Sequence, residues 1–161
     1  MINIEKTGAT LAILFENMRS EDKSELEYFF KSNTKEKFID ICLDDKNDTY
    51  ILGLDNKTPL AIGGVYTHYI EDYKFGQVWL LCANAYQKRK LCLYKYIFEK
   101  IKTFLCEYDI LFNFIYKTNF SAITWLKKMG FSFVELNNKD FRLFYLKKGG
   151  FEYDLRYFTC E

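Results

Sequence analysis

The chain has 161 residues, of which 49% are hydrophobic and 19% aromatic, and this supplies enough apolar side chain for one sizeable core. Its 23 basic and 22 acidic residues give a formal charge of +1, which argues against a dedicated nucleic-acid binder that must neutralise phosphates. No stretch approaches the ~18 apolar residues of a membrane span, so we expect a soluble protein without a spanning segment.

The cysteines form an odd set without CxxC spacing: Cys42, Cys82, Cys92, Cys106 and Cys160. Four of them lie within apolar runs, which predicts reduced, buried thiols. The single histidine, His68, has no neighbouring cluster of Cys, Asp or Glu at ligand spacing. The sequence therefore predicts no metal site.

Apolar spacing in the first half of the chain predicts a strand, two helices and a hairpin. The short apolar run at residues 9–16 is interpreted as a first strand. Helices with one apolar face are expected after Ser20 and over residues 34–42. Residues 49–54 and 60–67 have strand composition, and the Asp, Asn and Pro between them favour a turn, so these two runs should pair.

The second half reads as strand, helix, strand, helix, followed by two strands. Apolar runs at residues 75–83 and 110–116 predict the first two strands. Between them, apolar residues from 91 to 105 recur on one helical face and predict the longest helix. A last helix is expected from Asn119, a suitable cap, to Met129, because Gly130 can adopt the left-handed conformation that ends helices. Strands follow near residues 131–134 and 140–148, before a tail at 151–161.

The predicted order of elements is βααβββαβαββ. This order resembles the GNAT (Gcn5-related N-acetyltransferase) fold, in which an Asn and an Ala three residues later open the last helix and a Gly-Phe pair closes it. Asn119, Ala122 and Gly130-Phe131 stand at those positions. The resemblance implies a single GNAT-like α/β (α+β) domain over residues 1–161. It also implies a central mixed, mostly antiparallel sheet of about seven strands flanked by four helices.

A narrower resemblance covers about residues 19–150. The order and spacing of residues 59–64, 78–80, 108–114, 119–133 and 143–150 are similar to a small GNAT-like family of phage proteins. That family includes the internal virion (virion assembly) protein of T7-like podophages. The resemblance implies contacts with other phage virion or host proteins, in the host cell cytoplasm or in the virion interior. It implies no specific nucleic acid and leaves the oligomeric state open.

The GNAT resemblance also implies positions for a cofactor. In that fold the fourth and fifth strands splay apart, and the pantetheine arm of an acyl-CoA pairs with the exposed backbone of the fourth strand. The phosphates bind a Gln/Arg-x-x-Gly-x-Gly/Ala turn at a helix start. The matching residues are Leu81, Cys82, Ala83, Gln87, Lys88, Arg89, Lys90 and Asn119.

The turn departs from the family pattern, because Lys90 and Cys92 stand where small residues belong. Side chains there crowd the backbone that a phosphate must approach. Either the three cations of this turn bind phosphate by charge, or they form a solvated helix start. The resemblance therefore allows acetyl-CoA or CoA as a ligand, but the protein is not expected to require one.

The catalytic positions match the GNAT pattern less well than the cofactor positions do. Many GNAT enzymes place a tyrosine seven residues after the Asn to protonate the leaving thiolate, and here that residue is Leu126, which cannot transfer a proton. His68 and Tyr116 are the remaining weak candidates. The sequence predicts a phage assembly protein that acts through protein contacts, with acyl-CoA catalysis weak or lost. The alternative is an active acetyl-CoA-dependent N-acetyltransferase that modifies a host or phage amine.

Overall fold

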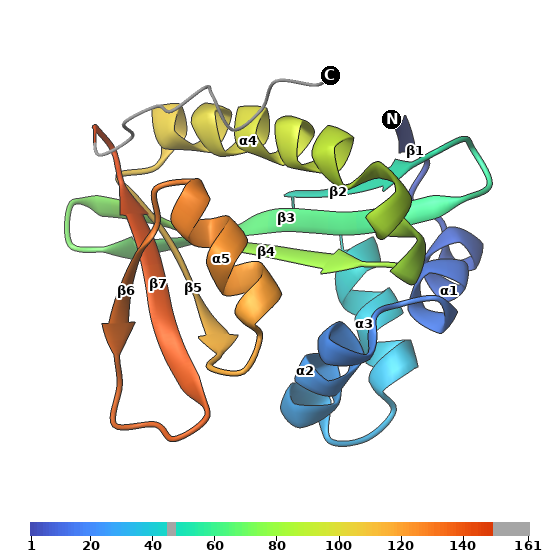
Figure 1. The fold of residues 1–161 in the computed structure, drawn as a ribbon, viewed down its shortest axis with the longest axis horizontal. Helices are drawn as coiled ribbons and strands as arrows, with labels where there is room; N and C mark the ends of the chain where they lie inside the picture. Colours follow the sequence, from blue (N-terminus) through green and yellow to red (C-terminus); the bar gives the residue numbers. More distant parts are fainter. Residues whose placement is uncertain (45–47, 150–161) are drawn as a thin grey trace. The chain divides into compact units, whose positions relative to one another are not determined.

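The structure is a computed structural model that describes residues 1–44 and 48–149. Its elements in chain order are β1 (Ile2–Ile4), α1 (Gly8–Glu16), α2 (Ser20–Phe30), α3 (Thr34–Leu43), β2 (Asp48–Gly53), β3 (Pro59–Ile70), β4 (Tyr73–Cys82), the 3₁₀ helix η1 (Asn84–Arg89), α4 (Lys90–Glu107), β5 (Ile110–Tyr116), α5 (Phe120–Lys128), β6 (Ser132–Glu135) and β7 (Phe141–Lys147) (Figure 1). Cys160 and the predicted tail at 151–161 lie outside the described residues.

The seven strands have the hydrogen-bonded order β1-β2-β3-β4-β5-β7-β6. Strands β4 and β5 run parallel, whereas the pairs β1–β2, β2–β3, β5–β7 and β6–β7 run antiparallel. A parallel pair needs a long crossover, and η1 and α4 supply it. The predicted mixed, mostly antiparallel sheet is confirmed.

The prediction for residues 9–16 was wrong, because this run is helix α1 and the first strand is β1 at Ile2–Ile4. The Thr7 side chain accepts a hydrogen bond from the Thr10 amide (3.2 Å) and caps the helix start. Leu11 and Leu14 are fully buried one helical turn apart. The described residues therefore hold five α-helices where the sequence predicted four.

The chain forms two compact units, and β3, β4 and α4 each contribute residues to both. The first unit comprises Met1–Tyr66 and Trp79–Leu93, and the second comprises Thr67–Val78 and the described residues from Tyr94 onward. The assignment of residues 1–161 to one domain stays a prediction.

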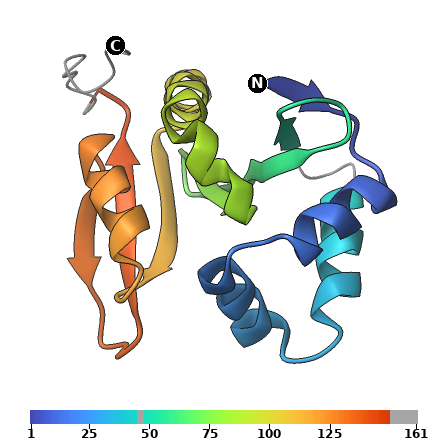
Figure 2. The same ribbon diagram turned by 45° about the vertical axis from the view of Figure 1, so that its right-hand side comes forward.

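The core of the first unit joins three helices to one end of the sheet. Leu11 and Leu14 of α1 pack with Phe38 and Cys42 of α3 and with apolar residues of β2, β3 and β4. Helix α3 lies beside both α1 and α2 (Figure 2). The hairpin between β2 and β3 turns where predicted, because Asp55 Oδ1 accepts from two backbone amides of the turn, at 2.8 and 2.9 Å.

In the second unit α5 packs on the strands that follow it in the sequence (Figure 1). The helix ends as expected: Gly130 has φ +86°, its amide donates to the Lys127 carbonyl (3.0 Å), and the Phe131 amide donates to the Leu126 carbonyl (3.1 Å). This is a Schellman cap. Phe131 then packs edge-on against Phe144 of β7, with ring centroids 5.3 Å apart.

The prediction that the cysteines are buried holds for Cys42 and Cys82 and fails for Cys92 and Cys106, which are exposed on α4. All four are free thiols. The failure has a simple cause, because α4 buries only the face that carries residues such as Leu93, and a neighbouring position in an apolar run can point to solvent.

Candidate functional site

The C-terminal end of β4, residues 81–83, carries three of the predicted cofactor contacts, and all three side chains are buried. The Cys82 amide donates to Asp22 Oδ2 (2.7 Å), and the Cys82 carbonyl accepts from the Arg19 amide (2.9 Å). The next amide, that of Ala83, donates to a β3 carbonyl (2.8 Å), so the Cys82 groups are those that point away from β3. The outward-facing backbone of Cys82 is therefore hydrogen-bonded to the chain's own residues.

The linker between α1 and α2 accounts for this pairing. Met18 forms an antiparallel bridge with Ala83, and the Asn84 amide donates to the Asn17 carbonyl (2.8 Å). The linker thus lies along the end of β4 like a very short added strand. Sequence reasoning missed this contact, because Asp22 could be recognised only as an acid in the first turn of a helix.

The pairing encloses a buried carboxyl group. Asp22 is only 4% exposed, and burial raises its pKa to about 6, although Arg19 and the Cys82 amide both favour the charged form. Arg19 Nη1 lies 3.8 Å from Asp22 Oδ1, and the guanidinium also lies over the Tyr86 ring, 5.4 Å from its centre. Burial likewise raises the pKa of the Cys82 thiol, which therefore cannot act as a nucleophile near neutral pH.

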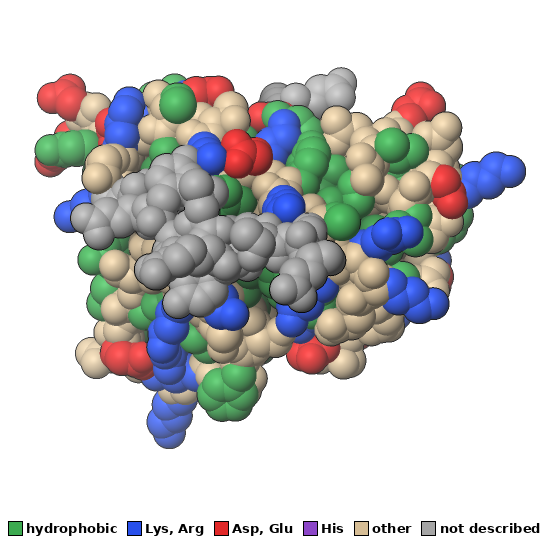
Figure 3. Space-filling view, turned by 45° about the horizontal axis from the view of Figure 1, so that its top comes forward, with side chains coloured by type: hydrophobic (Ala, Val, Ile, Leu, Met, Phe, Trp, Pro, Cys, Tyr) green, Lys and Arg blue, Asp and Glu red, His purple; other side chains and the backbone are tan. Residues whose placement is uncertain are grey.

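The predicted phosphate turn is the 3₁₀ helix η1 and the first residue of α4. Gln87, Lys88 and Arg89 are exposed, and Lys90 is half-buried. Gln87 Nε2 donates to the Tyr86 hydroxyl (2.7 Å). On the described part of the face in Figure 3, basic side chains occur among apolar and acidic ones at many separate places. Each residue of the turn carries a Cβ, which crowds the backbone that a phosphate must approach. Phosphate binding by charge stays a prediction.

Strands β4 and β5 stop pairing with each other in the second unit. Phe75 to Gln77 pair in parallel with Ile110 to Phe112, and the ladder ends there. Immediately beyond it, the Asn113 side-chain amide donates to the Val78 carbonyl (2.8 Å), while Asn113 Oδ1 accepts from Gln77 Nε2 (3.2 Å). A side-chain amide therefore bridges the two strands at the point where backbone pairing stops. An Asn inside the apolar run of β5 was the available signal, and sequence reasoning did not use it.

The two weak catalytic candidates lie apart in this unit. His68 is exposed; its Nε2 lies 3.0 Å from Gln77 Oε1, and its ring centre is 5.9 Å from that of Phe112. Tyr116 is four residues further along β5, roughly 13 Å at strand spacing, and its ring packs on Phe141 with centroids 4.1 Å apart. The structure does not bring these two side chains together.

Helix α5 carries the last predicted contact. The Asn119 side chain accepts from the Ala122 amide (3.3 Å), which confirms its role as a helix cap, and Asn119 is 8% exposed. Leu126, at the usual tyrosine position, is 6% exposed. Its neighbour Trp125 stacks on Tyr94 of α4, with ring centroids 5.1 Å apart. Packing therefore explains Leu126 and Trp125 without any role in proton transfer.

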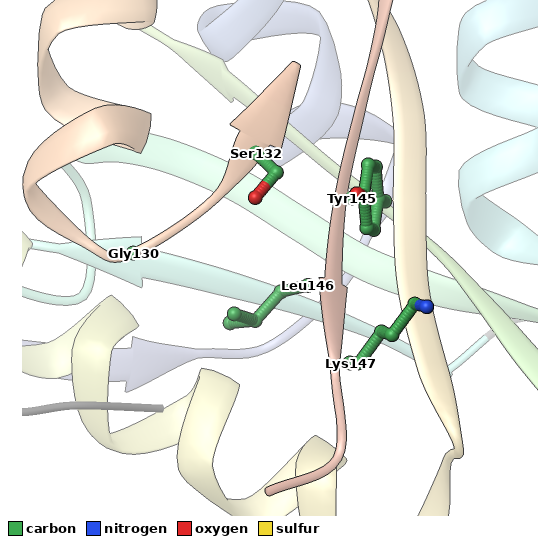
Figure 4. A pocket seen from close by; sticks show the side chains of 5 residues that line it. All are labelled: Gly130, Ser132, Tyr145, Leu146 and Lys147. Atoms are coloured by element: carbon green, nitrogen blue, oxygen red, sulfur yellow. The ribbon is translucent and has the colours of Figure 1, made fainter. Parts of the chain in front are cut away.

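A surface hollow of about 190 Å³ lies in the second unit, where β6 begins beside β7 (Figure 4). It is lined by Gly130, Ser132, Tyr145, Leu146 and Lys147. None of these residues was a predicted contact. The lining offers no carboxylate, thiol or imidazole, and Tyr145 and Lys147 are its two side chains of types that can transfer a proton.

Within residues 1–44 and 48–149, no group of three His, Cys, Asp or Glu side chains is arranged to hold a metal ion. In the same ranges, no helix combines the length and the apolar character that crossing a membrane requires.

Comparison with known proteins identifies the family. The sequence model of the family described as "Bacteriophage T7, probable scaffold protein Gp13" matches residues 49–137, from β2 to beyond β6. The chain belongs to this family. A curated relative, the probable scaffold protein gp13 of Escherichia phage T7, is 37% identical over 94 residues, which cover 57% of this chain and 65% of the relative. The match thus spans just under two thirds of that scaffold protein.

Solved structures of acetyltransferases have the same fold as this scaffold-family chain. The GNAT domain of S. lividans PAT aligns with a TM-score of 0.66 over 91% of this chain and 88% of that one, at 13% identity. An acetyltransferase from Thermus thermophilus aligns with a TM-score of 0.63 over 91% and 96%, at 15% identity. A spermidine N-acetyltransferase variant from Vibrio cholerae reaches 0.63 over 92% and 94%, at 11% identity. The predicted GNAT-like fold and the predicted phage family are both confirmed.

Proposed function

We propose that this protein acts in phage particle assembly through contacts with other phage or host proteins, and that acyl-CoA catalysis is weak or lost in it. Membership of the scaffold-protein family supports the assembly role. We place that role in the cytoplasm of the infected cell, with the virion interior as the alternative location. Mass spectrometry of purified particles distinguishes the two locations.

The hydrogen bonding of Cys82 is the observation that carries the catalytic half of this proposal. A pantetheine arm binds such a strand by pairing with an outward-facing amide and carbonyl, and both are already paired with Asp22 and Arg19. A ligand would have to displace two buried hydrogen bonds, each of which contributes about 0.5 to 1.5 kcal/mol, and would leave Asp22 buried without its donor. Two substitutions relative to the GNAT pattern also disfavour acyl-CoA catalysis. Lys90 stands where a small residue would admit the phosphates, and Leu126 stands where a tyrosine would donate a proton.

An active N-acetyltransferase is the second candidate, and the GNAT fold is the observation that favours it. In that case acetyl-CoA would be held by Leu81, Cys82, Ala83, Gln87, Lys88, Arg89, Lys90 and Asn119, with His68 or Tyr116 moving the proton. Because the linker between α1 and α2 is bonded to the end of β4, it would have to move away before acetyl-CoA could bind there.

A thermal shift measurement with acetyl-CoA separates the two candidates. A ligand at 100 times its dissociation constant stabilises a protein by about 2.7 kcal/mol, which should raise the melting midpoint of a domain of this size by roughly 5 to 10 °C. We expect no saturable shift with acetyl-CoA or CoA. A shift of that size would support the enzyme instead, and an active GNAT enzyme serves as the positive control for the assay.

Complementation tests the assembly role directly. Deletion of the gene from its phage should reduce particle yield, and the wild-type gene should restore it. A variant with Lys88, Arg89 and Lys90 all replaced by Gln should restore particle yield equally well, because the proposed role needs no CoA phosphate. Failure of this variant, despite normal expression and folding, would favour the acyltransferase.

A further inference from the structure

The N-terminal end of β4, in the second unit, carries a strip of aromatic side chains in which Tyr73 is exposed and Phe75 and Phe112 are half-buried. Tyr73 packs edge-on to Phe75 (6.5 Å between ring centres), Phe75 packs edge-on to Phe112 of β5 (6.1 Å), and Phe112 contacts His68 (5.9 Å). Ile70 is 58% exposed and Tyr73 is 56% exposed. Exposed apolar side chains that gather beside polar ones, as Ile70 and Tyr73 do here, are typical of an interaction site.

The strip continues across the sheet on one face. Phe112 pairs with Tyr145, and Ile110 pairs with Lys147, so these side chains share the face of Phe75. Figure 4 shows Tyr145 and Lys147 on one side of β7 and Leu146 on the other.

The opposite face of these strands is the covered one. The Tyr108 hydroxyl, just after α4, bonds to Thr67 Oγ1 (2.8 Å), on the side of β3 opposite to His68. Gly130, at the end of α5, lies against Leu146. Within the described residues of this unit, α4 and α5 therefore cover the other face and leave the strip open.

Opposite charges flank the strip at its two edges. The turn between β3 and β4 carries Glu71 and Asp72, both exposed, next to Ile70 and Tyr73. On β7, two strands further across the sheet, Lys147 is exposed at the other edge. The order across the face is therefore acidic, apolar, basic, with β5 in the middle.

This order is self-complementary. A two-fold axis parallel to β5 places the acidic turn of one copy over Lys147 of the other, twice, and stacks the two apolar centres on each other. An isologous contact requires such a pattern, because each patch must match itself. Two sheets can pack face to face about 10 Å apart with their strands nearly aligned.

We infer that this face binds a second copy of the chain and forms a symmetric, sheet-on-sheet dimer. A partner of another kind would need only one of the two charges, whereas a second copy uses both. Specific interfaces bury about 800 Å² on each partner with roughly 20 to 30 residues a side. The strip has fewer residues than that, so the dimer is weak, with a dissociation constant in the micromolar range. The inference is independent of the assembly role.

Sedimentation of the full chain, from low micromolar to several hundred micromolar, tests the dimer. We expect a reversible monomer–dimer equilibrium that Tyr73→Ser weakens at least about tenfold, because it removes an exposed aromatic side chain of the proposed contact. Phe29→Ser is the matched control, because Phe29 is a 61% exposed aromatic residue on α2 in the other unit. Monomer at every concentration, or a dimer that Phe29→Ser weakens and Tyr73→Ser does not, overturns the inference.

Charge exchange provides a second test that does not depend on apolar truncation. Lys147→Glu alone, and Glu71→Lys with Asp72→Lys, should each abolish self-association, because like charges then face each other. An equimolar mixture of the two variants should associate as a heterodimer with about the wild-type affinity. Unfolding curves of both variants establish that they are folded. A mixture that stays monomeric contradicts the proposed symmetry.

Discussion

The two ends of strand β4 differ in which backbone groups and side chains they leave available for a ligand or partner. At the C-terminal end, the amide and carbonyl of Cys82 are bonded to Asp22 and Arg19, and the side chains are buried. At the N-terminal end the backbone is paired, but Tyr73 and Ile70 remain exposed beside the half-buried Phe75. A ligand that pairs with the strand therefore finds the Cys82 groups already bonded at the first end, whereas apolar surface is still available at the second. The difference favours protein contacts over cofactor binding.

The largest effect is expected on the covered face of the sheet that carries the aromatic strip. Leu126→Ala should reduce the free energy of unfolding by about 2 to 5 kcal/mol, because it leaves a cavity beneath α5. Leu126→Tyr should cost about 1 to 3 kcal/mol by overpacking. Chemical denaturation measures both. A neutral Leu126→Tyr would mean that the position still has room for the tyrosine of an acyltransferase.

The buried carboxyl group at the other end of β4 should make stability depend on pH. The pKa of Asp22 is about 6 when folded and its ordinary value is 3.8, so between these values the folded state binds the extra proton. The contribution of Asp22 to stability is therefore fully present below pH ~4 and is lost as the pH rises to ~6, by about 3 kcal/mol at 1.36 kcal/mol per pKa unit.

Asp22→Asn isolates this contribution, because the amide oxygen can still accept from Cys82 without titrating. Urea denaturation at closely spaced pH values should show the decline between pH ~4 and ~6 in the wild type and a flatter profile in the variant. Identical profiles in the two proteins would show that Asp22 does not titrate in this window.

The cations of the turn after β4 should matter little. Replacement of Lys88, Arg89 and Lys90 by Gln removes positive charge from a helix start, where the helix dipole disfavours it, so stability should rise by about 0.3 to 1 kcal/mol at low salt. Binding of CoA or nucleic acid should not change. Weaker binding with a flatter salt dependence in the variant would assign these residues to a phosphate site.

The smallest effect is expected at the aromatic strip itself. Tyr73→Ser should change the stability of the monomer by no more than about 0.5 kcal/mol, because the side chain is exposed. Thermal unfolding at a concentration well below dimerisation gives this value. A large loss of stability would mean that Tyr73 is part of the core and not of an interface.

Local signals in the sequence were sufficient for the elements whose determinants are close in the chain. Asn119 and Gly130 mark the ends of α5 because a cap and a left-handed residue act within one helical turn. Asp55 marks the β2–β3 turn for the same reason. The order of these elements was enough to predict the GNAT-like fold.

Only the tertiary structure decided the features that depend on distant partners. The run at residues 9–16 is apolar on most sides, so its period did not distinguish strand from helix, and packing of Leu11 and Leu14 on α3 fixed it as a helix. Asp22 and Cys82 are 60 residues apart, and Asn113 and Val78 are 35 apart. The sequence by itself determined which residue types are present and where helices and turns begin. Which backbone groups remain free at each end of β4 was decided by folding, because a hydrogen bond between distant segments has no local pattern.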